Sequence, residues 1–331
     1  MSFGPIYIAG PERSGTSLIY ALLASHPNIA MTRRTNMWTH FFNQYGDISR
    51  PKNFERCLSM MMRYKRLLLL KPDPERIRRE FWQGEQTYAR LFALLEEHYA
   101  EQVGKPRWGD KSLNTERYAD AIFAAFPEAR ILHMVRDPRD RYSSALTRWK
   151  VSRGGVGAGS AIWLSSIKLA QQNQEKYPDQ YKIIRYETLV NQPEETMREI
   201  CAFIGEEYTP AIFSMDGAKT FRDEGGNSSY GQHEPGRISN KSIGRFRQVL
   251  SKRQIAFMQS MAGREMEAFG YILDNIHLSP FEQSLYYLLD VPINLARMAA
   301  WLLREAYLDQ IGRPVPSYRI VAGPDAIKAG A

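Results

Sequence analysis

The chain has 331 residues, 44% hydrophobic and 24% charged, and these ordinary values for a folded protein exclude intrinsic disorder and fibrous structure. It carries 44 Lys and Arg against 36 Asp and Glu, a net charge of +8, which favours an anionic partner such as a nucleotide, an acidic acceptor, an anionic membrane surface or nucleic acid. No signal peptide is visible, and the longest apolar stretch, residues 285–303, is interrupted by polar residues. We therefore predict a cytoplasmic protein without a transmembrane span.

The first unit of the sequence is a strand, a glycine-rich turn and a helix. Residues 6–9 are apolar and β-prone, and from Thr16 the apolar residues recur at helical spacing until Pro27 ends the pattern. Residues 54–101 show helical patterns. We predict a helical insertion, at about residues 53–103, that covers one side of a sheet.

The strand and helix pattern then returns. Residues 131–135 form an almost continuous apolar run, which is typical of a parallel strand buried on both faces, and Asp137-Pro138 opens the next helix. A second pair is a strand at residues 181–186 and a helix at 193–203 that ends at Gly205. This alternation predicts an α/β protein, a P-loop-like three-layer fold with a mostly parallel central sheet.

Two glycine-rich stretches, residues 152–160 and 223–241, are predicted as loops that serve as lids or binding segments. The C-terminal part has helical patterns at 252–269 and 280–308. We assign residues 1–270 to one domain and residues 271–331 to a helical extension that packs on it. The simplest role for the apolar side chains of the last helix is packing on the core, and the alternatives are a pocket wall, a homodimer contact or a membrane surface; these side chains are Leu285, Leu288, Leu289 and Leu295.

Residues 10–17, with the sequence GPERSGTS, lie where the first strand passes into the first helix. Backbone N–H groups and a helix N-terminus converge on an anion at such a turn, so the loop has the form of a phosphate cradle. In a Walker A loop a lysine precedes the final Ser or Thr, but here Thr16 stands at that position and the cation is Arg13. A glycine turn that only caps a helix explains the loop alone equally well.

A second candidate site follows the strand at 131–135. Arg136 lies at the carboxyl end of that strand, where open α/β sheets bind ligands, and Ser144 and Arg148 are four residues apart on one helix face. These three side chains suit a second phosphate. The alternative is a solvated helix start in which the charges of residues 136–141 pair with one another.

Together the two elements resemble the sulfotransferases that use 3'-phosphoadenosine 5'-phosphosulfate (PAPS). Residues 10–27 resemble the family's 5'-phosphosulfate loop, and residues 135–140 with Ser144 resemble its 3'-phosphate element. Residues 108–112 (WGDKS), 185–190 (RYETLV) and 241–246 (KSIGRF) continue the likeness, which spans roughly residues 5–270 in the family's order. Ordered motifs are far more specific than any single one.

The resemblance implies a role for each matched residue. Arg13 and Lys111 are the cations that meet the charge growing on the departing phosphate. The residues that would bind the 5'-phosphate are Ser14, Gly15, Thr16 and Ser17, together with Arg13. Those that would bind the 3'-phosphate are Arg136, Ser144 and Arg148. Tyr186 borders the nucleotide and Lys241 closes over it.

The base that takes the acceptor proton is harder to assign. Arg34 stands where tyrosine-sulfating relatives place a glutamate, which argues against a tyrosine-peptide acceptor or moves the base elsewhere. Asp110 beside Lys111 is the first alternative, although it would equally suit a partner that orients Lys111 or Arg13. His40 is the second alternative, although a half-buried histidine that only packs among aromatic residues would explain it as well.

The expected function is transfer of a sulfuryl group from PAPS to a hydroxyl or amine of a small-molecule, carbohydrate or lipid acceptor, by in-line displacement and without a metal ion. We predict no nucleic-acid partner, because no recognition helix, aromatic platform or zinc finger is present. The alternatives are a kinase-like P-loop phosphotransferase, against which Thr16 argues, and a catalytically inactive PAPS-binding protein.

Overall fold

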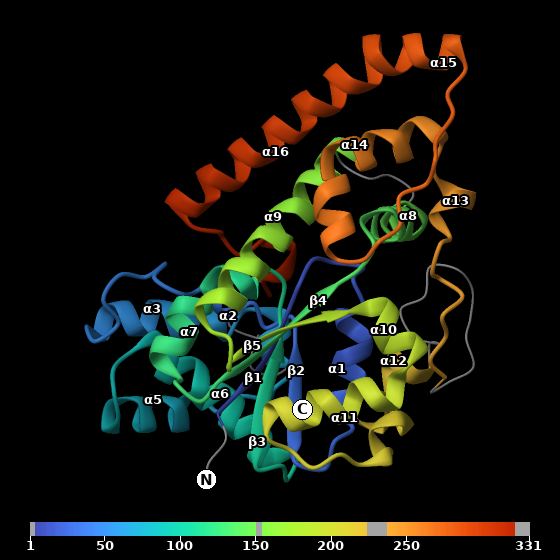
Figure 1. The fold of residues 1–331 in the computed structure, drawn as a ribbon. Helices are drawn as coiled ribbons and strands as arrows, with labels where there is room; N and C mark the ends of the chain where they lie inside the picture. The colour runs from blue at the N-terminus through green and yellow to red at the C-terminus, as the bar shows by residue number, and fades with distance from the viewer. Residues whose placement is uncertain (1–3, 150–153, 224–236, 322–331) are drawn as a thin grey trace.

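The computed structural model describes residues 4–149, 154–223 and 237–321. Its centre is a five-stranded parallel sheet in the order β2-β3-β1-β4-β5 (Figure 1). The strands are β1 (Ile6–Ala9), β2 (Ile29–Arg33), β3 (Arg107–Lys111), β4 (Arg130–Val135) and β5 (Tyr181–Arg185). The predicted α/β class with a parallel sheet is confirmed. Strand β2 was not predicted, because its polar end, Thr32-Arg33, hides the short apolar run.

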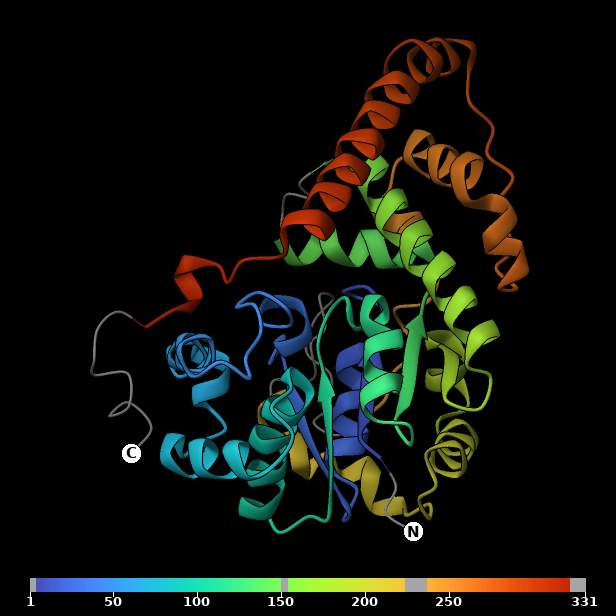
Figure 2. The same cartoon turned by 90° about the vertical axis from the view of Figure 1, so that its left-hand side faces the viewer.

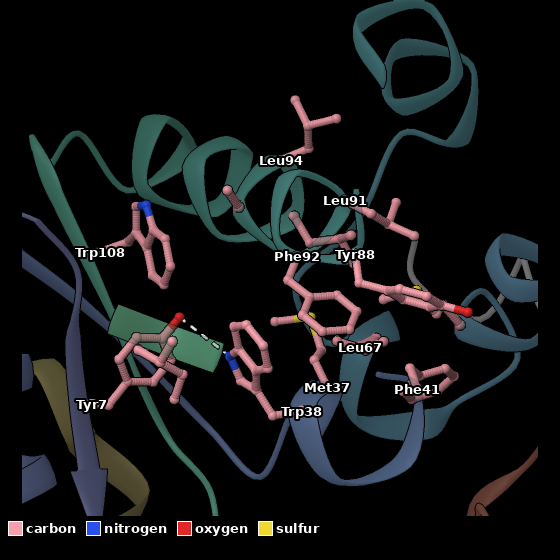
Figure 3. Packing of buried hydrophobic residues seen from close by; sticks show 14 of the residues in the cluster. Tyr7, Met37, Trp38, Phe41, Leu67, Tyr88, Leu91, Phe92, Leu94 and Trp108 are labelled. Carbon is pink, nitrogen blue, oxygen red and sulfur yellow. Dashed lines mark hydrogen bonds between the residues drawn. The ribbon is translucent and has the colours of Figure 1, made fainter. Parts of the chain in front are cut away.

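Side-chain alternation along β1 shows why helices cover both faces of the sheet. Ile6 and Ile8 join one core and Tyr7 and Ala9 join the other, and all four are buried. In the second core Trp38 Nε1 donates to Tyr7 Oη at 3.3 Å, and Trp108 lies against the Tyr7 ring (Figure 3). The result is three layers, helix on sheet on helix.

The two helical layers have different origins. The Tyr7 face is covered mostly by the predicted insertion, whose helices pack their apolar stripes on the sheet. The insertion contains α3 (Pro51–Met61), α4 (Lys65–Leu68), α5 (Pro74–Gln83) and α6 (Tyr88–Gln102), and α2 (Met37–His40) and α7 (Ala119–Ala125) complete this layer from outside it. The Ile6 face is covered by α1 (Thr16–Ala24), α10 (Tyr186–Asn191) and α11 (Pro193–Ile204). Helix α11 ends, as predicted, at Gly205 with φ +74°.

Above the carboxyl end of the sheet lie α8 (Pro138–Trp149), α9 (Gly155–Lys176), α13 (Phe246–Val249) and α14 (Lys252–Ala268) (Figures 1 and 2). The predicted loop at 152–160 is wrong from Gly155 onward, because those glycines begin α9. They are needed for close packing: a Cβ on Gly157 would lie 2.2 Å from the Asn294 carbonyl oxygen, and one on Gly159 2.6 Å from the Tyr142 ring. Most of the second predicted loop lies outside the described residues.

The C-terminal extension consists of α15 (Pro280–Leu285), a π-helical turn (Tyr286–Asp290) and α16 (Val291–Ile311). Helix α16 packs along α9 (Figure 1). The expectation that Leu288, Leu289 and Leu295 face the core is wrong, since all three are exposed. The approach to α9 instead uses Asn294, whose side-chain oxygen accepts the Gly157 N–H at 3.2 Å.

After α16 the chain crosses to the insertion. His40 Nδ1 lies 2.9 Å from the Arg313 carbonyl oxygen, Lys65 Nζ donates to the Tyr318 carbonyl at 3.0 Å, and the Val321 N–H donates to Arg63. We call residues 312–321 the C-terminal strap. Among the described helices, none is long and apolar enough to cross a membrane.

Candidate active site

The loop at residues 10–17 has a strained backbone that only its sequence permits. Gly10 has φ +112° and Gly15 φ +92°, and a Cβ on Gly10 would lie 2.4 Å from the Met134 carbonyl oxygen. Arg13 also has positive φ, at +68°, which is uncommon for a residue with a Cβ. The Gly10 N–H donates to Glu116 Oε2 at 3.4 Å. The Glu116 side chain therefore holds the loop at its first residue.

Helix α1 starts at this loop with its N-terminus uncapped by any side chain, because its N-cap residue is Gly15. The first N–H groups of a helix lack intrahelical acceptors, so those of α1 are available to an anion. The hydroxyl of Ser14 is buried and has no hydrogen-bond partner among the described residues. A buried polar atom without a partner is costly in a native protein and indicates a site for a ligand or water.

Arg136 lies at the carboxyl end of β4, as predicted, and only 5% of it is exposed. Its Nη1 donates to the Arg13 carbonyl at 3.1 Å and its Nη2 to the Ser242 carbonyl at 2.9 Å. The guanidinium stacks on the Tyr186 ring, 4.5 Å from its centre, while its Nε has no partner among the described residues. Tyr186 in turn covers Gly15, where a Cβ would meet the ring at 2.5 Å.

Ser144 connects the two predicted phosphate sites. Arg13 Nε donates to Ser144 Oγ at 2.9 Å, although the two residues are 131 positions apart. The structure therefore brings together Arg13, Arg136, Ser144 and Tyr186 around the loop.

The charged residues 136–141 are almost entirely buried, so the alternative of a solvated helix start is wrong. Arg139 makes a two-pronged ion pair with Asp137, at 3.0 and 2.7 Å. Asp140 accepts the backbone N–H groups of Gly244 and Phe246, at 2.7 and 2.9 Å. The two Asp140 hydrogen bonds tie the segment around Ser242 to the first turn of α8.

Ser242 was not predicted as a site residue, whereas its neighbour Lys241 was. Ser242 Oγ lies 2.8 Å from the hydroxyl of Tyr186, whereas Lys241 is exposed. Which of two adjacent polar residues in an irregular segment faces inward has no sequence signal. Glu116 was missed for the same reason.

Lys111 ends β3, and only 5% of it is exposed. Burial, reinforced by the positive charge of Arg34, lowers the pKa of its ammonium group to about 8. The Arg34 N–H donates to the Lys111 carbonyl at 2.8 Å, which fixes the two cationic residues side by side along the backbone.

Asp110 lies on the opposite face of β3, turned into the core. Thr32 Oγ1 lies 3.0 Å from Asp110 Oδ1 and 2.9 Å from Glu96 Oε1. Burial raises the pKa of both carboxyls, and repulsion from Asp110 raises that of Glu96 further. Only 2% of Asp110 is exposed, so its geometry suits positioning of β3. His40, the second candidate base, contacts the strap carbonyl described above.

Arg34 and Arg148 lie in one basic region, together with Arg319 of the strap. Burial lowers the pKa of Arg34, and the charges of neighbouring arginines, Arg319 and Arg148 among them, lower it further. Arg319 Nη1 donates to Tyr64 Oη at 3.3 Å, and that hydroxyl lies 3.3 Å from the Arg34 carbonyl. Arg148, predicted for a phosphate, is thus also near Arg34.

A cavity of about 1120 Å³ opens beside the loop, between α8, α9, α16 and the strap. Glu12 of the loop lines it, and its carboxylate lies 3.9 Å from Arg141 Nη2. Trp301 of α16 and Tyr318 of the strap form part of the lining. The C-terminal extension therefore supplies walls to a hollow that borders the phosphate-cradle loop.

Comparison with known proteins identifies relatives of this chain. Residues 5–210 match the model of the sulfotransferase family. The chain is 26% identical over 218 residues to a protein-tyrosine sulfotransferase of Drosophila melanogaster, covering 62% of this chain and 39% of the relative. It is 25% identical over 206 residues to protein-tyrosine sulfotransferase A of Caenorhabditis elegans, covering 60% and 49%. The chain thus spans less than half of these curated relatives.

Two solved structures share the fold. The sulfotransferase domain from the Synechococcus PCC 7002 olefin synthase superposes with a TM-score of 0.57 at 20% identity, covering 82% of this chain and 97% of that one. The sulfotransferase domain from the curacin biosynthetic pathway gives 0.53 at 15% identity, covering 82% and 99%. At these identities the likeness shows the fold alone.

Proposed function

Because this chain belongs to the sulfotransferase family, we propose that it transfers a sulfuryl group from PAPS to a hydroxyl or amine of a small-molecule, carbohydrate or lipid acceptor. The observation that carries the proposal is the direct connection of two anion-binding elements, the loop at 10–17 and the end of β4, through the Arg13–Ser144 and Arg136–Arg13 hydrogen bonds. PAPS carries a phosphate at each end of its ribose, and two joined sites match it.

The residues present fit this donor. Ser14 Oγ and Arg136 Nε are buried polar atoms without partners in the described part of the chain. Ser14, Gly15, Thr16 and Ser17 would hold the 5'-phosphate with their backbone and hydroxyl donors. Arg136 and Ser144 would hold the 3'-phosphate, and Tyr186 would border the nucleotide. Lys241 remains a further candidate for nucleotide contact.

Arg13 and Lys111 are the proposed catalytic cations. PAPS supplies the activated sulfuryl group when bound. Protonated Lys111 and Arg13 would stabilise the negative charge that develops on the departing 5'-phosphate, and the low exposure of Lys111 strengthens that interaction.

Glu12 is the better candidate for the proton acceptor, and Asp110 for a positioning residue. The Glu12 carboxylate lines the cavity beside the loop, whereas Asp110 is buried behind β3. We expect Glu12→Gln to lower kcat about a hundredfold or more with little change in PAP affinity. Asp110→Asn should instead lower thermal stability, and a larger kcat loss in Asp110→Asn than in Glu12→Gln would reverse the two roles.

The donor site is tested by isothermal titration with 3'-phosphoadenosine 5'-phosphate (PAP), beside AMP and ATP with magnesium. Wild type should prefer PAP. Arg136→Gln should weaken PAP binding about ten- to a hundredfold, because a charge-assisted contact to the 3'-phosphate is lost, and leave AMP binding unchanged.

Arg198→Gln is the matched control, because Arg198 pairs with Glu194 on the exposed face of α11. A preference for ATP with magnesium would favour a kinase-like phosphotransferase. Tight PAP binding without transfer to any acceptor would favour an inactive PAPS-binding protein.

A further inference from the structure

The cavity beside Glu12 is of the size and character of a substrate pocket. Its volume of about 1120 Å³ is slightly above the usual range of small-molecule sites, roughly 300–1,000 Å³. The walls include Tyr142, Ala158 and Ile162 of α8 and α9 and Trp301 of α16, so much of the lining is apolar or aromatic. Such walls suit the hydrophobic body of a ligand.

The polar lining of this cavity is strongly positive. Glu12 is the one carboxylate among the lining residues that the structure describes, against Arg141, Arg297 and Arg304. Arg141 is buried, and its Nε has no partner within the described residues. Arg304, by contrast, pairs with Glu305 at 3.0 Å.

The positive character continues beyond the lining. Ala145 lines the cavity one helical turn after Arg141 on α8, and Arg148 follows on the same face. Arg319 is the residue after Tyr318, which also lines the cavity. In the described part of the chain, neither Arg34, Arg148 nor Arg319 forms an ion pair with a carboxylate.

Three arginines gathered without carboxylates repel one another unless an anion joins them. Arg34 is exposed, and the charges that act on its guanidinium within the described residues are those of other cations, Arg66 and Arg33 first. The cluster lies on the side of the loop that holds Glu12 and Lys111, because Arg34 is bonded through its backbone to Lys111.

We propose that this cavity binds the acceptor, and that the acceptor is an amphipathic hydroxyl compound with an acidic group, which Arg34, Arg148 and Arg319 bind. This inference rests on the proposed sulfuryl transfer. The acceptor oxygen forms the new bond to sulfur, its proton passes to the Glu12 carboxylate, and the bond from sulfur to the 5'-phosphate oxygen breaks with its electron pair on the phosphate. The C-terminal extension is then part of the acceptor site.

The test compares two probes of equal length that differ only in charge, ω-hydroxylaurate and ω-hydroxylauramide, both below their micellar concentrations. Each is titrated calorimetrically into the full-length protein saturated with PAP. The carboxylate should bind about ten- to a hundredfold more tightly than the amide. In Arg319→Gln this preference should shrink several-fold, and in Arg319→Lys, which keeps the charge, it should largely return.

Three outcomes are distinguishable. Equal binding of the two probes, or binding of neither, to the PAP complex overturns the inference and leaves the donor site intact. Loss of PAP affinity in Arg319→Gln also overturns it, because the arginines would then serve the nucleotide. Failure of the wild type to bind PAP would overturn the proposed function itself.

Discussion

At the scale of single residues, the arrangement around the loop depends on charges that have been removed from water. Arg136 and Lys111 are each nearly buried, and Arg136 has both backbone and aromatic partners. Burial makes such charges costly to the fold and effective toward an anion. This combination is typical of a binding site and unusual in a purely structural turn.

Lys111 gives the site an expected alkaline limit. Its pKa of about 8 means that its positive charge is present below pH 8 and is lost as the pH rises through that value. If protonated Lys111 assists departure of the phosphate, kcat/KM for PAPS should fall above about pH 8. Lys111→Arg should move this decline to higher pH, since arginine keeps its charge.

The measurement is the pH profile of kcat/KM for wild type, Lys111→Arg and Lys111→Gln. The glutamine variant should have low activity and no decline near pH 8. If kcat/KM of Lys111→Arg still declines near pH 8, the decline belongs to the titration of another group.

At the scale of elements, the glycines of α9 set how closely α16 approaches. Gly157 faces the Asn294 carbonyl, and its own N–H binds the Asn294 side chain. The glycine-rich composition that resembles a loop therefore reflects a helix crossing with no room for side chains. In an ordinary helix the same composition would be unfavourable.

Gly157→Ala tests this crossing. Alanine is the better helix former by about 1 kcal/mol, so a solvent-facing site would be stabilised. Here we expect destabilisation by about 1–3 kcal/mol and faster hydrogen exchange across residues 291–311, because the added methyl group meets backbone. Denaturant unfolding and exchange mass spectrometry measure both, and Lys168→Ala on the exposed side of α9 is the control. A stabilised variant would contradict the close crossing.

At the scale of the whole molecule, one ion-pair cluster joins the C-terminal extension to the α/β body. Glu305 of α16 accepts from Arg117 at 3.2 Å and from Arg313 at 2.7 Å, and Asp309 pairs with the same two arginines. Arg313 lies near the start of the strap, which brings Tyr318 to the cavity. The cluster therefore stabilises both the extension and the position of the strap at the proposed acceptor site.

Glu305→Gln should lower the free energy of unfolding by about 3 kcal/mol, because it leaves two largely buried arginines with less than their full counter-charge. We also expect the substitution to speed hydrogen exchange more in residues 312–321 than in the sheet. Glu194→Gln, which removes an exposed pair on α11, should cost less than about 1 kcal/mol. Uniform exchange changes throughout the sheet would show that the extension does not respond as a unit.

The sequence alone determined the features whose signals are local. The strand before Gly10, the helix after Gly15, the apolar run before Arg136 and the one-turn spacing from Ser144 to Arg148 each depend on neighbouring residues, so periodicity and turn chemistry reveal them. These signals predicted the α/β class and placed Arg13, Arg136 and Ser144 in one region; their roles toward PAPS stay predictions.

Only the tertiary structure decided which distant residues join them. Glu12 and Trp301 line one cavity, Arg34 and Arg319 share one basic region, and Gly157 packs on Asn294. Each pair is more than a hundred positions apart, and no local pattern encodes such proximity. The inward direction of Asp110 was likewise set by sheet packing, because its strand carries polar residues on both faces. The phosphate-cradle loop can therefore be recognised in the sequence, whereas the proposed acceptor cavity forms only because the C-terminal extension folds back across the molecule.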